Sequence, residues 1–353
     1  MNDTILRWSM TGAVLLATGC PGDPEPSSSD TTGEFPMLTS EGTSSGTTTA
    51  DTNMVTTTST GTTGSTSSSG TGDTTEGNDT QSFTFDLGVL PDAPEFDQGC
   101  RKVDFLFVID NSGSMTAQQM QLQNSFPGFI TAMQATLEDS VDSYHVGVIT
   151  SDNYNGNAPG CQTLGDLVSK TAGGNSSNMD CTPFAEGHRF ATEMDDLTTK
   201  FECIGRVGTS GSGTEQPITA LLASFDPAKR GVGGCNEAFL RDDAILVVVV
   251  ITDDPPAGTL DDANLMTDTS TWYDSVVAAK NGDPEAMVVI GFVPWMNVSC
   301  VPLNIESPNL VGFVQSFGAQ GVLASVCEPD YGPIFAQAVD TIVTTCENFE
   351  PPA

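Results

Sequence analysis

The stretch VDFLFVIDNSGSM, residues 103–115, decides the fold of this chain. Residues 103–109 are almost continuously apolar and rich in β-branched and aromatic side chains, which is typical of a strand buried on both faces of a parallel sheet. Directly after them, Asp110, Ser112 and Ser114 place one carboxylate and two hydroxyls on alternate positions. Such oxygen donors in a tight loop suit a small, hard cation such as Mg²⁺. Ligands of open α/β sheets bind outside the carboxyl ends of the strands, so we expect a binding site here.

A second apolar run ends in acidic residues. Residues 244–252 (AILVVVVIT) predict another buried strand, and Asp253 follows it. Between the two strands, the sequence VGTSGSGTEQPITALLASF begins as a Gly- and Ser-rich loop. It continues as a predicted helix from Thr214 to about Phe225. Both predicted strands therefore end in oxygen-bearing side chains.

Together these segments resemble the von Willebrand factor A (vWA) domains, the fold of integrin inserted domains, over roughly residues 100–347. The Asp-x-Ser-x-Ser pattern after the first strand resembles the family's metal-ion-dependent adhesion site (MIDAS). The downstream aspartate and the loop threonine follow in the family's order, with Thr209 as the alternative threonine. Five residues match the family's metal-binding positions: Asp110, Ser112, Ser114, Thr214 and Asp253.

The resemblance implies both a fold and a chemistry. The implied fold is a doubly wound, Rossmann-like α/β domain with a mostly parallel sheet, spanning residues 100–349. The implied cofactor is Mg²⁺, or Mn²⁺ or Ca²⁺ in its place, bound by the two serine hydroxyls. Thr214 would bind directly or through water, and the two aspartates would act mainly through bound waters. A cation with few directly bound carboxylates stays positive, so it takes a partner protein's carboxylate as its last ligand.

Two other interpretations of the motif stay open. Ser, Asp and Gly also build metal-free turns between a strand and a helix, although the matches at Thr214 and Asp253 favour a metal site. A metal-assisted hydrolase is the catalytic alternative. Residues 100–349 have no H-E-x-x-H, G-x-S-x-G or P-loop motif, and Ser112 has no evident base. The sequence therefore predicts a binding domain and not an enzyme.

Other acidic residues near the motifs are expected to have ordinary roles. We expect Glu215 and Gln216 in the first turn of the predicted helix, where an acid interacts favourably with the helix dipole. Asp254 is expected to be solvated or to pair with a basic group. The acidic segment from Asp253 to Asp268 lacks the EF-hand pattern and predicts a charged surface loop.

The remaining sequence alternates between strand and helix patterns, which favours a parallel sheet covered on both faces. Residues 117–138 predict a helix with Met120 and Phe126 among its apolar positions and a kink at Pro127. The other expected strands and helices lie at 145–150, 286–293 and 321–326, and at 270–280, 307–317 and 331–346.

Residues 151–213, called the insert below, form an unusually long connection with three cysteines. Loops of this length are commonly functional or tied down, and we expect both here. The insert contains one helical pattern, with Met194 and Phe201 on its apolar face, and also His188. The other histidine, His145, begins a predicted strand and is expected to be structural.

Composition separates a low-complexity region from a globular one. Residues 20–99 are dominated by Ser, Thr, Gly, Asp and Pro, with too few large apolar groups to offset the entropy of ordering, so we expect a disordered linker. The net charge is −35; residues 1–19 are neutral and residues 20–99 carry −13, which leaves −22 for the globular part. A domain this acidic is repelled by nucleic acid and anionic lipid, so the fold itself is expected to bind neither.

The amino terminus indicates export. Residues 1–19 contain an apolar run that is too short to span a membrane but suits a secretory signal peptide. The stretch Ala17-Thr18-Gly19-Cys20 resembles a bacterial lipoprotein cleavage site, which implies lipidation of Cys20 and membrane contact through that anchor alone. A signal peptide cut elsewhere is the alternative. The resemblance implies anchoring to the bacterial envelope, at the outer membrane, with a periplasmic or an external face left open.

The cysteines support this compartment. Without Cys20 the chain has eight cysteines, and an even set in an exported domain implies disulfides. No C-x-x-C motif occurs, which argues against a thiolate zinc site. The positions of Cys100 and Cys346 in the sequence suggest a bond that joins the two ends of the domain, as in some vWA domains. A Cys300–Cys327 bond would bracket the last strand–helix unit. The pairing stays open among the other four: Cys161, Cys181, Cys203 and Cys235.

The sequence thus predicts an envelope-anchored vWA-type domain whose metal site binds a protein partner. The linker would hold the domain clear of the membrane, and the insert would rim the site and set partner choice. The alternative is a structural or assembly protein of the envelope, in which the cation only stabilises the loops.

Overall fold

Six strands form one sheet in the computed structural model, which describes residues 100–137, 141–255, 262–264 and 269–352. The strand order is β3-β2-β1-β4-β5-β6, and every neighbouring pair is parallel except β2 and β3. This confirms the expected α/β fold with a mostly parallel sheet, while the antiparallel β3 was not predicted. The expected signal peptide, lipidation site and linker lie outside the described residues. The bounds are β1 Lys102–Ile109, β2 Ser143–Thr150, β3 Ala191–Thr192, β4 Ile245–Ile251, β5 Met287–Val293 and β6 Gly321–Ser325.

The two central strands, β1 and β4, place the site. Every residue from Val103 to Ile109 and from Ile245 to Ile251 is buried, because helices cover both faces of the sheet. The strands are paired so that Ile109 lies opposite Ile251 and both strands end at one edge. The chain runs outward from β1 to β2 and β3, then returns to β4 and continues to β5 and β6. Ligands of open α/β sheets bind where the strand order reverses in this way.

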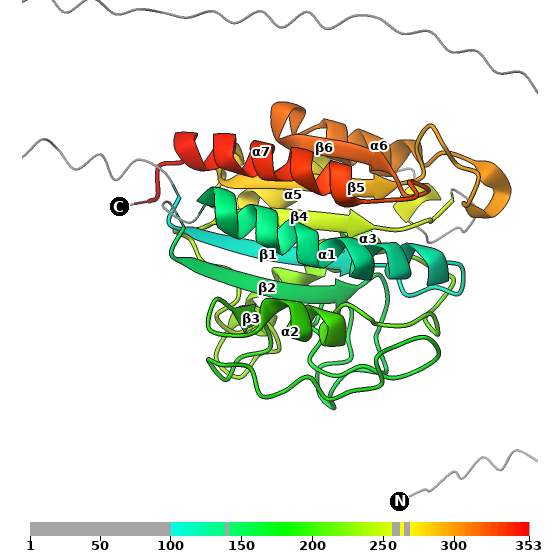
Figure 1. Ribbon diagram of the computed structural model, residues 1–353, viewed down its shortest axis with the longest axis horizontal. Helices are drawn as coiled ribbons and strands as arrows, with labels where there is room; N and C mark the ends of the chain where they lie inside the picture. Colours follow the sequence, from blue (N-terminus) through cyan, green and yellow to red (C-terminus); the bar gives the residue numbers. More distant parts are fainter. Residues whose placement is uncertain (1–99, 138–140, 256–261, 265–268, 353) are drawn as a thin grey trace, which may run out of the picture. The chain divides into compact units, whose positions relative to one another are not determined.

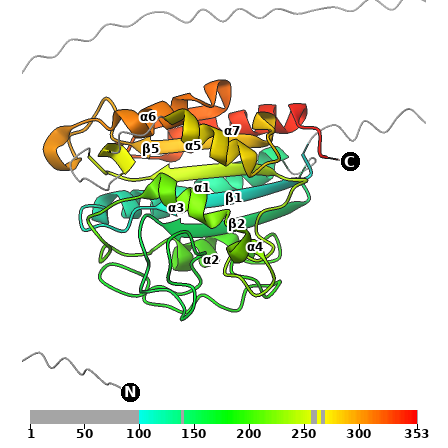
Figure 2. The ribbon, with the colours of Figure 1, turned by 180° about the vertical axis from the view of Figure 1, so that it is seen from behind.

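Helices pack on both faces of the sheet, with α1, α2 and α7 on the face toward the viewer in Figure 1 and α3, α5 and α6 on the opposite face, seen in Figure 2. Pro127, the expected kink, lies inside α1. None of the helices in the described part of the chain is long and apolar enough to cross a membrane. The helices are α1 Thr116–Leu137, α2 Leu197–Ile204, α3 Pro217–Ser224, α4 Pro227–Arg230, α5 Thr269–Ala278, α6 Pro308–Gln315 and α7 Gly332–Asn348, with 3₁₀ turns at Asp262–Asn264, Pro284–Ala286, Pro302–Asn304 and Gly318–Gln320.

Aromatic rings join two helices to the central sheet. Phe126 of α1 stacks on Phe201 of α2 with 3.5 Å between the ring centroids, and Phe107 of β1 meets both rings edge-on. Edge-on and stacked aromatic pairs of this kind add to the energy of apolar burial. Two expected core positions are wrong: Met120 is 59% exposed on α1, and Met194, which is 72% exposed, precedes α2.

Four disulfides cross-link the described residues. Two of them, Cys100–Cys346 and Cys300–Cys327, are the pairs suggested by position in the sequence. The first lies beside a backbone hydrogen bond from Cys100 N to Cys346 O of 3.0 Å, so it ties the start of β1 to the end of α7. The other four cysteines, whose pairing the sequence left open, form the disulfides Cys161–Cys235 and Cys181–Cys203. The first joins the insert to the segment after α4, and the second cross-links the insert internally.

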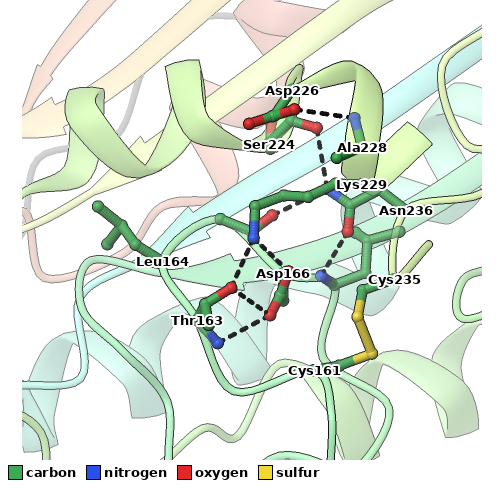
Figure 3. Close-up of polar contacts among 12 residues, drawn as sticks. Cys161, Thr163, Leu164, Asp166, Ser224, Asp226, Ala228, Lys229, Cys235 and Asn236 are labelled. Carbon is green, nitrogen blue, oxygen red and sulfur yellow. Dashed lines mark hydrogen bonds and ion pairs between the residues drawn. A yellow bond between two sulfur atoms is a disulfide. The ribbon is translucent and has the colours of Figure 1, made fainter. Parts of the chain in front are cut away.

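A buried ion pair also fastens the insert, as Figure 3 shows. Asp166 is 4% exposed and pairs with Lys229 of α4. The Thr163 N–H and hydroxyl both donate to Asp166 Oδ2 at 2.7 Å, and Lys229 Nζ donates to the same hydroxyl at 2.7 Å. The Asn236 side chain accepts from a backbone N–H of the insert and donates to the end of α3. The insert is therefore tied to the α3–α4 region by both covalent and polar links.

Replacing Gly291 of β5 with Ala should test the packing of α6 on the sheet. A Cβ atom at this position would lie 2.5 Å from Val314 Cγ2, and this β-branched side chain has little rotational freedom in a helix. We expect the unfolding free energy to fall by about 1–3 kcal/mol, measured by urea denaturation. The control is Gly128→Ala in α1, where no atom lies within 4 Å and Ala favours the helix. Equal stability of Gly291→Ala and the original chain would contradict this packing.

Candidate metal centre

Asp110 is the first residue after β1 and is fully buried. Its N–H donates to Ile251 O at 3.0 Å, which continues the pairing of β1 with β4. Its carboxylate accepts from Ser112 N at 2.7 Å, Thr252 Oγ1 at 2.7 Å and Ser151 Oγ at 3.3 Å. These donors follow the ends of β1, β4 and β2. The sheet itself therefore fixes the orientation of this carboxylate.

A chain of hydroxyls links Asp110's loop to Asp253. Ser112 Oγ lies 3.1 Å from Ser114 Oγ, and Ser114 Oγ donates to Asp253 Oδ1 at 2.9 Å. The other oxygen, Asp253 Oδ2, is buried and accepts no hydrogen bond from any described residue. The structure thus brings together four of the five residues singled out from the sequence.

A third carboxylate, which sequence reasoning missed, lies in the same cluster. Glu215 is 6% exposed, and one carboxylate oxygen from each of Glu215, Asp110 and Asp253 lies within 4.8 Å of the other two. The expectation that Glu215 and Gln216 belong to the first helical turn is wrong, since α3 begins after them.

The start of α3 explains why Glu215 is available to the cluster. Pro217 takes the first helical position, where its missing N–H costs nothing. The next two N–H groups of α3 donate to Asp262 Oδ2 at 2.7 and 2.9 Å. The helix is therefore capped without Glu215. Two backbone hydrogen bonds fix Glu215 just before α3 begins. Gln216 N donates to Ser151 O at 2.9 Å, and Asp262 N donates to Glu215 O at 3.1 Å.

The two threonines considered from the sequence lie in different surroundings. Thr214 directly precedes Glu215, is partly exposed, and donates its N–H to Ser212 Oγ at 3.0 Å. Together with residues of the insert, it lines a cavity of about 760 Å³. Thr209 accepts a hydrogen bond from Asn175 Nδ2 of the insert at 2.8 Å. Of the two, Thr214 is the residue next to the carboxylates.

Polar contacts fix the insert against the site. Gln119 of α1 is buried, and its Nε2 donates to Asp110 O at 2.8 Å and to Gly208 O at 2.7 Å. Gly208 N donates back to Gln119 Oε1 at 3.1 Å. On the other side, Asn111 Nδ2 donates to Asp152 Oδ1 at 3.0 Å. The loop after β1 is thereby tied to both ends of the insert.

Burial raises the pKa of each of the three carboxyls. For Asp110 this rise is opposed by hydrogen bonds from Ser112 and Thr252. Burial, and then the charge of Asp110, raises the pKa of Asp253 to about 7 and the pKa of Glu215 to about 10. Without a cation, the cluster therefore retains a proton at neutral pH, because three buried like charges cannot all ionise. A cation bound there would replace that proton.

The spacing of the oxygens fits a divalent cation. Around Mg²⁺, with metal–oxygen bonds of about 2.1 Å, neighbouring ligand oxygens lie about 3 Å apart and opposite ligand oxygens about 4.2 Å apart. Around Ca²⁺ the corresponding oxygen–oxygen distances are about 3.4 and 4.8 Å. The spacings of 3.1 Å between the two serine hydroxyls and 2.9 Å between Ser114 Oγ and Asp253 Oδ1 match neighbouring ligands, and the three carboxylates lie close enough together to share one cation. Asp253 Oδ2 is in addition a buried acceptor that lacks a donor. The buried acidic triad could therefore hold a metal ion.

Two further acidic residues are buried, contrary to expectation. Asp254 is 1% exposed and its Oδ2 accepts from Ala263 N at 3.3 Å, so it is not a solvated residue. Asp262 is fully buried as the cap of α3, so it does not belong to a charged surface loop. Asp261 and Asp268 lie outside the described residues.

The histidines lie away from the carboxylate cluster. His145, on β2, is buried; its Nδ1 donates to Phe239 O at 2.7 Å and lies 3.5 Å from Asp104 near the start of β1. Burial lowers the His145 pKa to about 4, so the ring is neutral at physiological pH. His188 of the insert stacks on Phe190.

No protein-family model matches the chain, and no curated protein matches it.

The raised pKa values predict how the metal-free protein responds to pH. A group whose pKa is raised by folding contributes stability that is fully present below its unfolded pKa and is lost as pH rises through the folded value. In EDTA, the unfolding free energy should therefore fall as pH rises through about 7 for Asp253 and about 10 for Glu215. In Mg²⁺ the fall should be smaller, because the cation replaces the lost proton. Urea denaturation over this range that gave the same profile in EDTA and in Mg²⁺ would contradict the site.

Proposed function

We propose that residues 100–349 form a von Willebrand factor A domain whose MIDAS-like site binds a protein partner through a divalent cation. One observation carries the proposal: Ser114 and Asp253, 139 residues apart in the sequence, hydrogen-bond each other beside Asp110 at the ends of β1 and β4. The strand order, which runs outward from the centre in both directions, supports the doubly wound topology of that family.

Mg²⁺ is the proposed cation, with Mn²⁺ or Ca²⁺ as substitutes. The side chains of the site offer carboxylate and hydroxyl oxygens, the donors that hard cations prefer. Ser112 and Ser114 would bind it directly, while Asp110, fixed by three donors, and Asp253 would hold its waters in place. When bound, the cation supplies the positive charge that accepts a partner's carboxylate oxygen.

The insert is proposed to select the partner. The cavity of about 760 Å³ beside the site is lined by the insert and by Asn111, Thr214 and Gln216. Asp152 is the only charged residue in that lining, and amides and hydroxyls make up most of the rest. A partner segment that reaches the cation passes this surface. Because disulfides and the Asp166–Lys229 pair fasten the insert, the surface is formed before the partner arrives.

The proposed location is the bacterial envelope, with Cys20 as lipid anchor and residues 20–99 as a stalk. A flexible chain of this length has a root-mean-square reach of about 50 Å, and more when its charges repel one another. The net charge of −35 supports a protein partner over nucleic acid or anionic lipid, both of which would be repelled.

The structural or assembly role is the second candidate, and Glu215 is the observation that favours it. Three carboxylates exceed the charge of a divalent cation, and a site closed by the chain's own ligands would stabilise the loops without recruiting a partner. In that case the cation would still raise the stability of the domain.

Partner binding should depend on both the cation and Ser114. The immobilised full chain would be tested by surface plasmon resonance against a panel of purified matrix proteins and glycoproteins, in Mg²⁺ and in EDTA. We expect EDTA to abolish binding, and Ser114→Ala to weaken it by about ten- to a hundredfold, because one hydroxyl of the site is lost. Thr136→Ala removes an exposed hydroxyl near the other end of α1, which donates to Ala132 O of the same helix, and should bind as the original chain does.

Two results would go against the proposal. Binding that persists unchanged in EDTA would rule out its metal-dependent form. Partner binding that is unaffected in Ser114→Ala, although Mg²⁺ no longer raises the melting temperature of that variant, would favour the structural role.

A further inference from the structure

Glu215 is outside the set of ligands that the vWA resemblance implies, and yet its carboxylate lies with those of Asp110 and Asp253. We propose that Glu215 is a built-in ligand that occupies, in the partner-free protein, the coordination position taken by the partner's carboxylate. The inference rests on the proposed function, because it concerns the same cation. It makes partner binding an exchange of one carboxylate for another.

The charge of the site favours an exchange over a simple addition. Asp110 and Asp253 together balance a divalent cation, and Glu215 adds a third negative charge beside them. A partner carboxylate that arrived with Glu215 still in place would bring a fourth negative charge into a buried site, where unpaired charge is costly. If Glu215 leaves as the partner's carboxylate arrives, the net charge stays the same.

The carboxylates are also held in different ways. Asp110 accepts from groups that follow three strand ends, so it is part of the sheet's framework. The Glu215 carboxylate lies against those of Asp110 and Asp253, which are themselves members of the site. The Glu215 backbone is fixed by hydrogen bonds to Ser151 and Asp262 on either side of the Glu215–Gln216 peptide bond. In the proposed exchange the Glu215 side chain moves while these hydrogen bonds hold its backbone.

Space for the displaced side chain lies next to the site. Thr214 and Gln216, the two neighbours of Glu215 in the sequence, both line the cavity of about 760 Å³. Its amide and hydroxyl groups, including the hydroxyl of Ser212, can solvate a carboxylate together with water, although Asp152 in the same lining carries a like charge. Glu215 could thus move from a buried position to a hydrated one.

The test uses the full chain loaded with Mn²⁺, with acetate as the carboxylate probe. Bound Mn²⁺ is paramagnetic and broadens the acetate methyl resonance when acetate binds beside it. We expect no specific broadening with the original chain, where Glu215 occupies the position, and clear broadening with Glu215→Ala. Glu202→Ala, which removes an exposed carboxylate from α2, is the matched control and should behave as the original chain.

Glu215→Gln keeps the shape of the side chain and checks that the variants fold, through their circular dichroism and thermal unfolding. We expect both Glu215 variants to bind Mn²⁺ about ten- to a hundredfold more weakly and still measurably. Loss of all Mn²⁺ binding in both folded variants would overturn the inference, since a displaceable ligand cannot be indispensable.

The remaining outcomes separate the inference from the proposed function. Equal broadening with the original chain and with Glu215→Ala would overturn the inference and leave metal-dependent partner binding standing. Absence of broadening in every Mn²⁺-loaded protein would overturn the inference and favour a structural cation. Absence of Mn²⁺ binding in the original chain would overturn both.

Discussion

Three carboxylates buried against one another where β1 and β4 end are the constraint on which the site depends. Removing Asp110, Asp253 and Glu215 from water while leaving them within 4.8 Å of each other opposes their ionisation. The folded chain must therefore keep a proton or bind a cation there. The sheet imposes this arrangement, because Asp110 continues the pairing of β1 with β4 and accepts hydrogen bonds from both strand ends.

The surrounding structure is consistent with recognition at that point. Disulfides and the Asp166–Lys229 pair hold the insert in place, and Gln119 ties it to the loop after β1. The proposed partner would therefore meet a preformed cavity lined by the insert, and the side chain of Glu215 would rearrange. Preformed surfaces of this kind favour binding because little conformational freedom is lost on association.

The central strands and much of the site could be predicted because their signals are local. A continuous apolar run followed directly by Asp110, or by Asp253, marks a buried strand and its carboxyl end at once. Glu215 could not be predicted in the same way, since its position depends on where α3 begins and on a cap from Asp262, 44 residues beyond Ile218. The burial of Asp254 could not be predicted either. Two adjacent acidic residues usually indicate a solvent-exposed position, whereas here contacts with residues distant in the sequence bury Asp254. β3 has only two residues, too few for a periodic pattern.

Anomalous X-ray diffraction from crystals of the Mn²⁺-loaded protein would test the central claim most directly, because the scattering of Mn²⁺ locates the ion without reference to any assumed ligand. The account predicts one strong anomalous peak among the carboxylates of Asp110, Glu215 and Asp253, within bonding distance of the hydroxyls of Ser112 and Ser114. A well-diffracting crystal soaked in Mn²⁺ that showed no peak there, or showed its strongest peak elsewhere on the domain, would contradict it.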